Sequence, residues 1–220
     1  MVTSREPRTR AQAQAQRAAM ADVEVRPMRR RHLPSVLAIE ELVYPKPWSQ
    51  RLFASEISQP DSRCYLVAVV KPGRVWRRRR VVGYAGVMVA VGEAHITTVA
   101  THPHHHRRKI ASHLLVELLR RARSMGAEAA TLEVRVNNRG AQRLYAGFGF
   151  APVGVRRRYY GETGEDALIM WAYDLHSDAY SEILQRQAAR LSLPGGDSGA
   201  ADLHVPWVQQ RVGLPSENGD

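Results

Sequence analysis

The sequence is poor in cysteine and contains no long apolar run. Cys64 is the only cysteine among 220 residues, which excludes an internal disulfide bond and a zinc site built from several thiolates. No stretch approaches the roughly 20 consecutive apolar residues that a membrane-spanning helix needs. The N-terminus carries four arginines within its first 17 residues and lacks the apolar run of a secretory signal. These absences predict a soluble protein of the reducing cytoplasm with no membrane partner.

Acidic residues are scarce relative to basic ones, and the excess of positive charge lies in the middle of the chain. The sequence has 32 Lys and Arg against 21 Asp and Glu. Residues 23–175 hold 25 of the basic residues and 13 of the acidic ones, whereas residues 176–220 are acidic overall. Such a field favours polyanionic partners, namely a phosphate-bearing cofactor, nucleic acid or a ribosome. The charge alone does not choose among them.

Large apolar residues are also scarce at both ends, which divides the chain into three parts. Residues 1–22 are rich in Gln, Ala and Arg and predict a flexible basic arm. Residues 23–175 have the apolar periodicity of one folded domain. Residues 176–220 predict a C-terminal extension, with an amphipathic helix around residues 180–191 and then a disordered segment rich in Gly, Ser and Asp.

The spacing of apolar residues in the central part predicts a mixed α/β domain. Strands are predicted at residues 23–25, 65–70, 81–91, 94–101, 130–136, 148–153 and 167–173. Helices are predicted at residues 34–44, from Ser49 to Pro60, at residues 110–125, and from Asn137 or Asn138 to Tyr145. The order of these elements predicts a single, mainly antiparallel sheet flanked by helices.

A basic turn joins the predicted strand at residues 94–101 to the helix that follows. It runs from Pro103 to Ser112 and contains three histidines, two arginines and a lysine. The first turn of a helix leaves backbone N–H groups unpaired, and the helix dipole adds about half a positive charge there. This arrangement predicts a binding site for a diphosphate. The alternative is a solvated loop in which the basic residues have no common ligand.

A strand and the next helix place an acid and a tyrosine where they can meet. Leu132 and Val134 face one side of the predicted strand, so Glu133 and Arg135 face the other. Tyr145 follows on the next helix and lies on the same helical face as Asn138. Glu133 and Tyr145 can therefore converge on one cleft. A salt-bridged glutamate and a core tyrosine are the structural alternative.

Together these stretches resemble the GNAT superfamily of acetyltransferases, and within it the bacterial ribosomal-protein-alanine N-acetyltransferases of the RimI type. The resemblance covers about residues 23–175. The positions that carry it are Glu40, Tyr44, residues 47–49, 82–86, 93–100 and 132–135, Asn138, Leu144, Tyr145, residues 147–150, Tyr159, Tyr160 and residues 166–170.

The resemblance implies a GNAT fold and an enzyme that moves the acetyl group of acetyl-CoA to a protein N-terminal α-amine. The substrate it implies is the N-terminal alanine of small-subunit ribosomal protein eighteen. Glu133 matches the general base and Tyr145 the general acid that protonates the leaving thiolate. The residues that match cofactor contacts are Val99, Ala100, Thr101, Arg107, Arg108, Lys109, Ile110, Ala111, Ser112 and Asn138. Trp48, Tyr159 and Tyr160 match the walls of the peptide groove, and no metal is implied.

The basic turn departs from the family's phosphate loop at two positions. The family usually has Gln or Arg, two variable residues, Gly, one residue, then Gly or Ala, where this chain has His106, Lys109 and Ala111. Glycine lets the backbone approach phosphate closely, and Lys109 forgoes that freedom. The lysine ammonium either binds phosphate as a point charge or replaces the glycine at a loss of affinity.

Several alternatives remain open from the sequence. Glu93 ends a neighbouring strand and is a second candidate base. The cluster formed by His102 and residues 104–106 lacks a nearby acidic or cysteine ligand, so it predicts support for phosphate binding and no metal site. Residues 77–80 form a run of arginines that predicts a solvated hairpin tip, and a nucleic-acid contact there fits the charge without being required. The competing functions are a GNAT enzyme with broader specificity for N-termini, lysine or small amines, and a non-catalytic ribosome-binding module.

Overall fold

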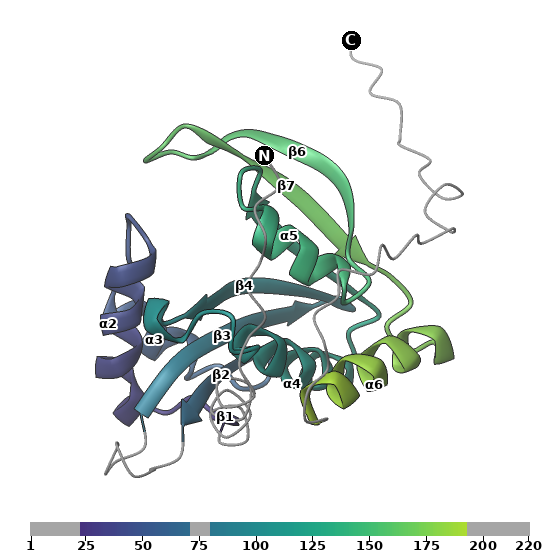
Figure 1. The fold of residues 1–220 in the computed structure, drawn as a ribbon, viewed down its shortest axis with the longest axis horizontal. Coiled ribbons are helices and arrows are strands. Elements are labelled where there is room, and N and C mark those ends of the chain that lie inside the picture. The colour runs from purple at the N-terminus through teal and green to yellow at the C-terminus, as the bar shows by residue number, and fades with distance from the viewer. Residues whose placement is uncertain (1–22, 71–79, 193–220) are drawn as a thin grey trace, which may run out of the picture.

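The computed structural model describes residues 23–70 and 80–192 (Figure 1). Its strands are β1 (Val23–Pro27), β2 (Arg63–Val70), β3 (Arg80–Ala90), β4 (Glu93–Thr101), β5 (Ala129–Arg135), β6 (Ala151–Tyr160) and β7 (Glu165–Ala172). Its helices are η1 (Arg30–His32), α2 (Leu33–Val43), α3 (Gln50–Glu56), η2 (Pro103–His105), α4 (Ile110–Ser124), α5 (Arg139–Ala146) and α6 (Asp178–Ser192). The predicted basic arm, most of the arginine run at 77–80 and the tail after residue 192 lie outside the described residues.

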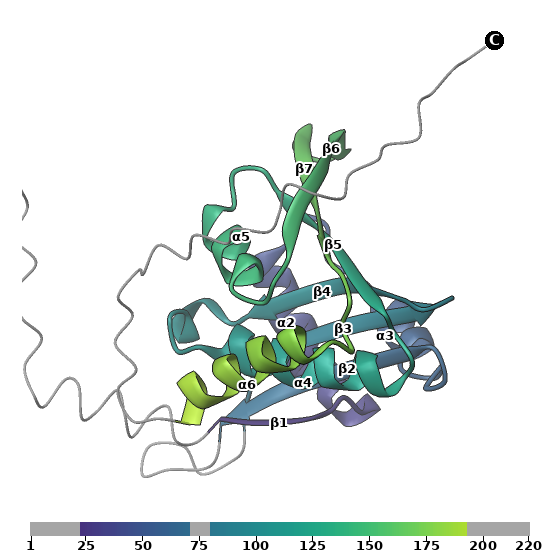
Figure 2. The same cartoon turned by 90° about the vertical axis from the view of Figure 1, so that its right-hand side faces the viewer.

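The strands form one seven-stranded sheet in the order β1-β2-β3-β4-β5-β7-β6. All neighbouring pairs are antiparallel except β4 and β5, which are parallel. Helices α2 and α3 lie against one face of the sheet, and α4 and α6 against the other (Figures 1 and 2). The predicted fold class, a single mixed and mainly antiparallel sheet flanked by helices, is confirmed.

The alternation of side chains along the strands builds a separate apolar core on each face. In β2, Leu66 and Ala68 point to the α4 side, whereas Tyr65 and Val67 point to the α2 side. The larger core gathers α4, α5 and α6 over the sheet. Because both faces are covered, the central strands are nearly continuous apolar runs, as the sequence indicated.

Local capping explains where two of the shorter helices begin. The Ser49 hydroxyl accepts a hydrogen bond from the backbone N–H of Leu52, which confirms the predicted N-cap of α3. For α5 the sequence left Asn137 and Asn138 open, and the structure selects Asn138, whose Oδ1 accepts from the N–H of Ala141 at 3.0 Å. Helix α5 therefore starts at a fixed residue, which sets the position of Tyr145 two turns later.

The predicted strand at residues 148–153 begins too early, because a tight turn occupies its first residues. The backbone N–H groups of Phe148 and Phe150 both donate to the carbonyl of Tyr145, at 2.9 and 3.2 Å. Gly149 has a φ of +85°, a conformation that side-chain-bearing residues rarely adopt. Phe148 and Phe150 are buried in this turn, so their alternation resembled that of a strand. The strand β6 starts at Ala151 and runs to Tyr160.

The predicted C-terminal helix exists as α6, and it is part of the packed domain. Its apolar stripe includes Tyr180 and Leu184, which are 4% and 2% exposed and belong to the same core as α4. The folded unit therefore continues beyond residue 175, where the sequence placed the end of the domain. Among the described residues, no helix is both long enough and apolar enough to cross a membrane.

Candidate active site

β4 and β5 are hydrogen-bonded neighbours only over their first residues. Their parallel pairing stops at His95 and Thr131, although β4 continues to Thr101 beside β3, and β5 continues to Arg135 beside β7. A bulge in the β3–β4 pairing falls just beyond His95. From there β5 leaves β4 at an angle (Figure 2), and in the part of the chain that the structure describes no strand pairs with residues 96–101 on the β5 side. An open strand edge of this kind suits a ligand that carries amide groups, which fits the predicted contacts of Val99, Ala100 and Thr101.

The basic turn leads directly into an uncapped helix start. Lys109 is the N-cap of α4 and makes no side-chain cap hydrogen bond, and α4 has no acidic residue in its first turn. By contrast, α3 and α5 are capped by Ser49 and Asn138. The first N–H groups of α4, at Ile110, Ala111 and Ser112, are therefore not capped by the Lys109 side chain, and a helix start of this kind suits an anion.

Lys109 keeps the backbone conformation that a glycine would take at its position. Its φ is +56°, and Arg107 also has a positive φ of +61°. The Lys109 ammonium points away from the turn, because Nζ donates to the carbonyl of Arg190 near the end of α6 at 2.9 Å. The sequence left two roles open for Lys109, a phosphate ligand or a replacement of glycine that weakens cofactor binding. The structure adds a third role, a contact to α6.

The histidines of the turn have structural partners. His105 is 9% exposed and its Nδ1 lies 2.7 Å from Nη1 of Arg108. A guanidinium only donates, so Nδ1 accepts, and burial together with Arg108 lowers the pKa of His105 to about 4. Nε2 of His106 lies 3.3 Å from the Thr101 carbonyl. The described residues contain no group of three or more His, Cys, Asp or Glu side chains that could hold a metal.

Glu133 on β5 and His95 on β4 face each other where the strands separate. His95 Nε2 lies 2.7 Å from Glu133 Oε2, and Nη1 of Arg156 on β6 lies 3.0 Å from Glu133 Oε1. The Glu133 side chain is 8% exposed. The hydrogen bond from His95 lowers the pKa of Glu133 and outweighs burial, which acts in the opposite direction. Glu133 is therefore an ionised carboxylate held by two partners.

The ionisation of Glu133 fixes the tautomer of a neutral His95. A carboxylate only accepts hydrogen bonds, so the shared hydrogen belongs to Nε2 and leaves Nδ1 unprotonated. The His95 side chain is 34% exposed, so solvent reaches the ring. Glu93, the alternative base, is exposed at the start of β4, where it pairs with Ala90 and Ala129. Glu93 thus lies on the closed side of the opening, away from the free strand edge.

Tyr145 of α5 is close to two other tyrosines that come from different elements. It is 8% exposed, and its pKa is raised by burial and by the proximity of Tyr44 and Tyr160. Tyr44, just after α2, donates from its hydroxyl to the carbonyl of Val99 at 3.3 Å. This contact places the three tyrosines beside the open edge of β4. The phenol of Tyr145 stays protonated at neutral pH.

Comparison with known proteins agrees with this geometry. Residues 33–150 match the Acetyltransferase (GNAT) family. The chain belongs to the GNAT acetyltransferases. It is 35% identical over 147 residues to a provisionally named ribosomal protein bS18-alanine N-acetyltransferase of Bacillus subtilis, a match that covers 67% of this chain and 93% of the relative.

Two further comparisons point the same way. The ribosomal protein bS18-alanine N-acetyltransferase of Escherichia coli K12 is 30% identical over 140 residues, which covers 63% of this chain and 88% of that protein. The crystal structure of the Escherichia coli ribosomal-protein-S18-alanine N-acetyltransferase superposes with a TM-score of 0.60 at 27% identity, covering 69% of this chain and 94% of the other. As a GNAT enzyme the chain uses acetyl-CoA as its acyl donor.

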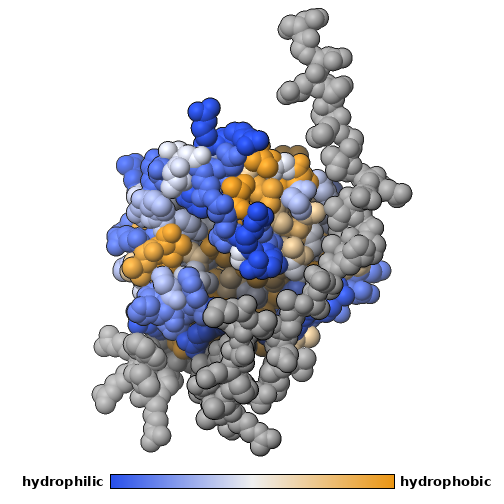
Figure 3. Space-filling view, turned by 45° about the horizontal axis from the view of Figure 1, so that its top comes forward, coloured by the Kyte–Doolittle hydropathy of each residue, from blue (hydrophilic) through white to orange (hydrophobic). Residues whose placement is uncertain are grey.

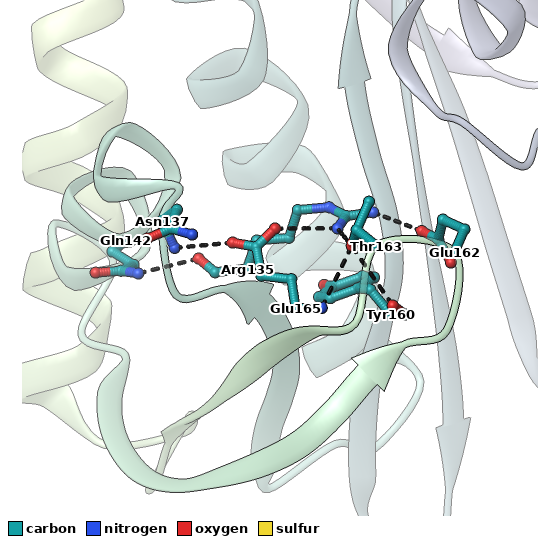
Figure 4. Close-up of polar contacts among 7 residues, drawn as sticks. All are labelled: Arg135, Asn137, Gln142, Tyr160, Glu162, Thr163 and Glu165. Atoms are coloured by element: carbon teal, nitrogen blue, oxygen red, sulfur yellow. Dashed lines mark hydrogen bonds and ion pairs between the residues drawn. The ribbon is translucent and has the colours of Figure 1, made fainter.

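The β6–β7 hairpin, which carries Tyr159 and Tyr160, is held to β5 by Arg135 (Figure 4). The guanidinium stacks 3.8 Å from the ring centroid of Tyr160. It also donates to Glu162 at 2.6 Å, to Thr163 at 2.8 Å and to Glu165 at 3.1 Å. Arg135 follows Glu133 by two residues on β5, so the strand that carries the Glu133 carboxylate also holds Tyr160. Burial raises the pKa of Tyr160 to about 12.

Trp48, which the sequence predicts to be a wall of the peptide groove, lies in the loop between α2 and α3, and its groove role stays a prediction. Its ring packs against Phe53 with 5.3 Å between ring centroids. The Trp48 backbone N–H donates to Oε1 of Glu40 at 3.0 Å. Glu40 is 2% exposed, its Oε2 has no hydrogen-bond partner among the described residues, and burial raises its pKa to about 7. Glu40 therefore holds the loop that carries Trp48.

The structure brings Tyr145 and Tyr160 together near Val99, but the partners of Glu133 were not predicted. His95 is 38 positions away from Glu133 in sequence and no spacing links the two. Arg156 comes from β6, and no spacing links it to Glu133 either. Tyr159 is 44% exposed and stands edge-on to Tyr160. Asn138 is seen to cap α5, and its contact with the cofactor stays a prediction.

Proposed function

We propose that this chain acetylates the N-terminal α-amine of a protein in the cytoplasm, with the N-terminal alanine of ribosomal protein bS18 as its substrate. The observation that carries the proposal is the ionised Glu133 beside His95 at the point where β4 and β5 separate. The names of the Bacillus and Escherichia coli relatives support the choice of substrate. In this proposal Glu133 and Tyr145 are the acid–base groups, and the open edge of β4 with the basic turn is the donor site.

Acetyl-CoA fits the residues that line the opening. The free edge of β4 at Val99, Ala100 and Thr101 offers backbone groups to the pantetheine arm. The residues proposed for the diphosphate are Arg107, Arg108, Lys109, Ile110, Ala111 and Ser112, with Asn138 as a further contact. Positive charge and unpaired helix N–H groups are the two features that a diphosphate needs.

The reaction requires an unprotonated amine and a group that removes its proton. A protein α-amine has a pKa of about 8 and lysine one of about 10.4, so deprotonating lysine costs over about 3 kcal/mol more. As the amine nitrogen bonds to the acetyl carbon, its proton passes to the Glu133–His95 pair. Glu133 is the general base through His95, whose Nδ1 is the unprotonated atom of the pair. The ion pair with Arg156 keeps the carboxylate charged.

The carbon–sulfur bond breaks in the second half of the reaction, and the sulfur needs a proton. Tyr145 supplies it as general acid, because its raised pKa keeps the phenol protonated until the thiolate forms. Backbone N–H groups of the open β4 edge stabilise the negative charge that develops on the acetyl oxygen. Tyr44 supports this edge through its bond to the Val99 carbonyl.

The groove for the peptide lies between the α2–α3 loop and the β6–β7 hairpin. Trp48 forms one wall, and Tyr159 and Tyr160 form the other. On the face that includes the hairpin end of the molecule, hydrophilic side chains surround separate apolar patches (Figure 3). Such a surface favours a peptide over a purely apolar ligand.

The test is acetylation of a peptide panel followed by mass spectrometry. A peptide with a free N-terminal Ala should be acetylated far faster than the same peptide with a blocked N-terminus and an added lysine. Peptides with other first residues measure the preference for alanine. Faster reaction of the lysine peptide would overturn the α-amine assignment and support a broader GNAT enzyme. No acetylation of any amine would support the ribosome-binding module instead.

A further inference from the structure

Helix α6 lies along α4 and contacts it near both of its ends. Arg123, near the end of α4, donates from Nη2 to the Ser181 hydroxyl at 2.9 Å, and Lys109, at the start of α4, donates to the Arg190 carbonyl at 2.9 Å. The two helices are therefore antiparallel along their full length. The second contact ties the last turn of α6 to the basic turn that is proposed to bind diphosphate.

The middle of α6 contacts the turn at residues 147–149, directly after α5. Nε2 of Gln187 donates to the carbonyl of Gly147. A Cβ atom on Gly147 would lie 3.3 Å from that nitrogen, and one on Gly149 would lie 3.3 Å from side-chain carbons of Ile183 and Tyr180. The two glycines thus allow α6 to approach the turn closely. The amide of Gln187 satisfies a carbonyl at the end of α5 that has no partner within the helix.

The same turn holds the main chain of Tyr145. The N–H groups of Phe148 and Phe150 both donate to the Tyr145 carbonyl, and the Phe150 ring stands edge-on to the Tyr145 ring with 6.1 Å between centroids. Phe148 is 1% exposed and Phe150 is 2% exposed, so neither can shift freely. A short and fully packed path therefore leads from Gln187 to Tyr145.

We propose that α6 is a brace for acetyl transfer, with Gln187 as a positioning residue for Tyr145. Lys109 connects α6 to the basic turn as well. One helix therefore supports both Tyr145, the proposed acid, and the proposed diphosphate site. The inference rests on the proposed role of Tyr145. It gives the C-terminal part of the chain, which lies after the residues matched by the GNAT family, a function in the reaction.

The first test compares two glutamines on the same helix. Gln187→Met keeps the length of the side chain and removes the amide donor, and Gln185→Met makes the same change at an exposed position. Loss of one hydrogen bond predicts a kcat about three- to tenfold lower for Gln187→Met, with the KM for acetyl-CoA unchanged. Gln185→Met should match the full-length wild type. Equal kcat values in the two variants would contradict the proposal that α6 positions Tyr145 through Gln187.

The second test asks whether the effect passes through the Tyr145 hydroxyl. In a Tyr145→Phe background, Gln187→Met should cause no further loss of kcat, because the group being positioned is gone. An equal loss in both backgrounds would show a general structural effect and would contradict the role as a positioning residue.

A third measurement does not depend on activity, so it separates this inference from the proposed function. Amide hydrogen exchange should be faster at residues 145–150 in Gln187→Met than in Gln185→Met. If the wild type acetylates no peptide, the proposed function fails while this comparison still decides whether α6 supports the turn. Unchanged exchange at these amides would contradict the proposal that α6 supports the turn at residues 147–149.

Discussion

At the scale of single residues, Glu133 has partners that change its role from that of an isolated base. The sequence placed it on the open face of a strand, and the structure adds His95 and Arg156 on either side of the carboxylate. A carboxylate with a lowered pKa holds a proton weakly. In the proposed reaction the carboxylate therefore acts together with its partner His95.

The first prediction at this scale concerns the proton acceptor. Glu133→Gln keeps the shape of the side chain and removes the charge, so kcat should fall by roughly 10²–10⁴-fold with little change in CoA affinity. His95→Gln should also lower kcat, because the amine proton then loses its acceptor. Steady-state kinetics with an N-terminal Ala peptide measure both.

Glu93→Gln is the matched control, since it makes the same change at an exposed carboxylate on the same strand as His95. We expect this variant to keep near-normal activity. A near-normal rate for Glu133→Gln combined with a large loss for Glu93→Gln would move the base to Glu93.

At the scale of elements, the start of α4 combines a left-handed residue with an uncapped helix. Lys109 has a φ of +56°, which costs a side-chain-bearing residue about 1–2 kcal/mol relative to a right-handed conformation. The same lysine ties α4 to α6 through the Arg190 carbonyl. Position 109 therefore combines a strained backbone with a side chain that contacts α6.

The prediction for this element separates the two contributions. Lys109→Gly removes the strain and the ammonium, whereas Lys109→Met removes only the ammonium. Because the ammonium is engaged with α6, we expect CoA affinity by calorimetry to be unchanged or higher in the Gly variant. Weaker CoA binding by both variants would show that the Lys109 ammonium is a phosphate ligand.

At the scale of the whole molecule, Glu40 makes stability depend on pH. Its pKa of about 7 in the folded protein is raised from the 4.5 of a free side chain, so the folded state binds the proton more tightly than the unfolded state does. The resulting stability is present below about pH 4.5 and is lost as pH rises to about 7. The shift corresponds to up to about 3 kcal/mol.

The prediction compares the wild type with Glu40→Gln, which can still accept the Trp48 N–H and does not titrate. Denaturant unfolding gives the difference in the free energy of unfolding, Gln variant minus wild type. This difference should be more positive at pH 8 than at pH 5. Other titrating groups cancel in the difference between the two proteins. A difference that is the same at both pH values would contradict the raised pKa.

Whole-molecule packing also explains which features could be predicted from the sequence. Ser49 as a cap and the helix predicted at residues 110–125 follow from local patterns, and both are confirmed, the helix as Ile110–Ser124. The pairing of His95 with Glu133 depends on where two strands separate, and no local pattern encodes that. The turn at residues 147–149 was missed because two buried phenylalanines alternate as they would in a strand.

The burial of α6 has a practical consequence for producing the protein in fragments. A fragment that ends at residue 175 keeps all the strands of the described residues, yet it uncovers one side of α4. Leu114, Leu118 and their neighbours share a core with Tyr180 and Leu184, so removing α6 exposes a contiguous apolar patch to water. Surfaces of that kind associate with one another. We therefore expect a fragment that ends at residue 175 to self-associate more than one that retains the chain through residue 192.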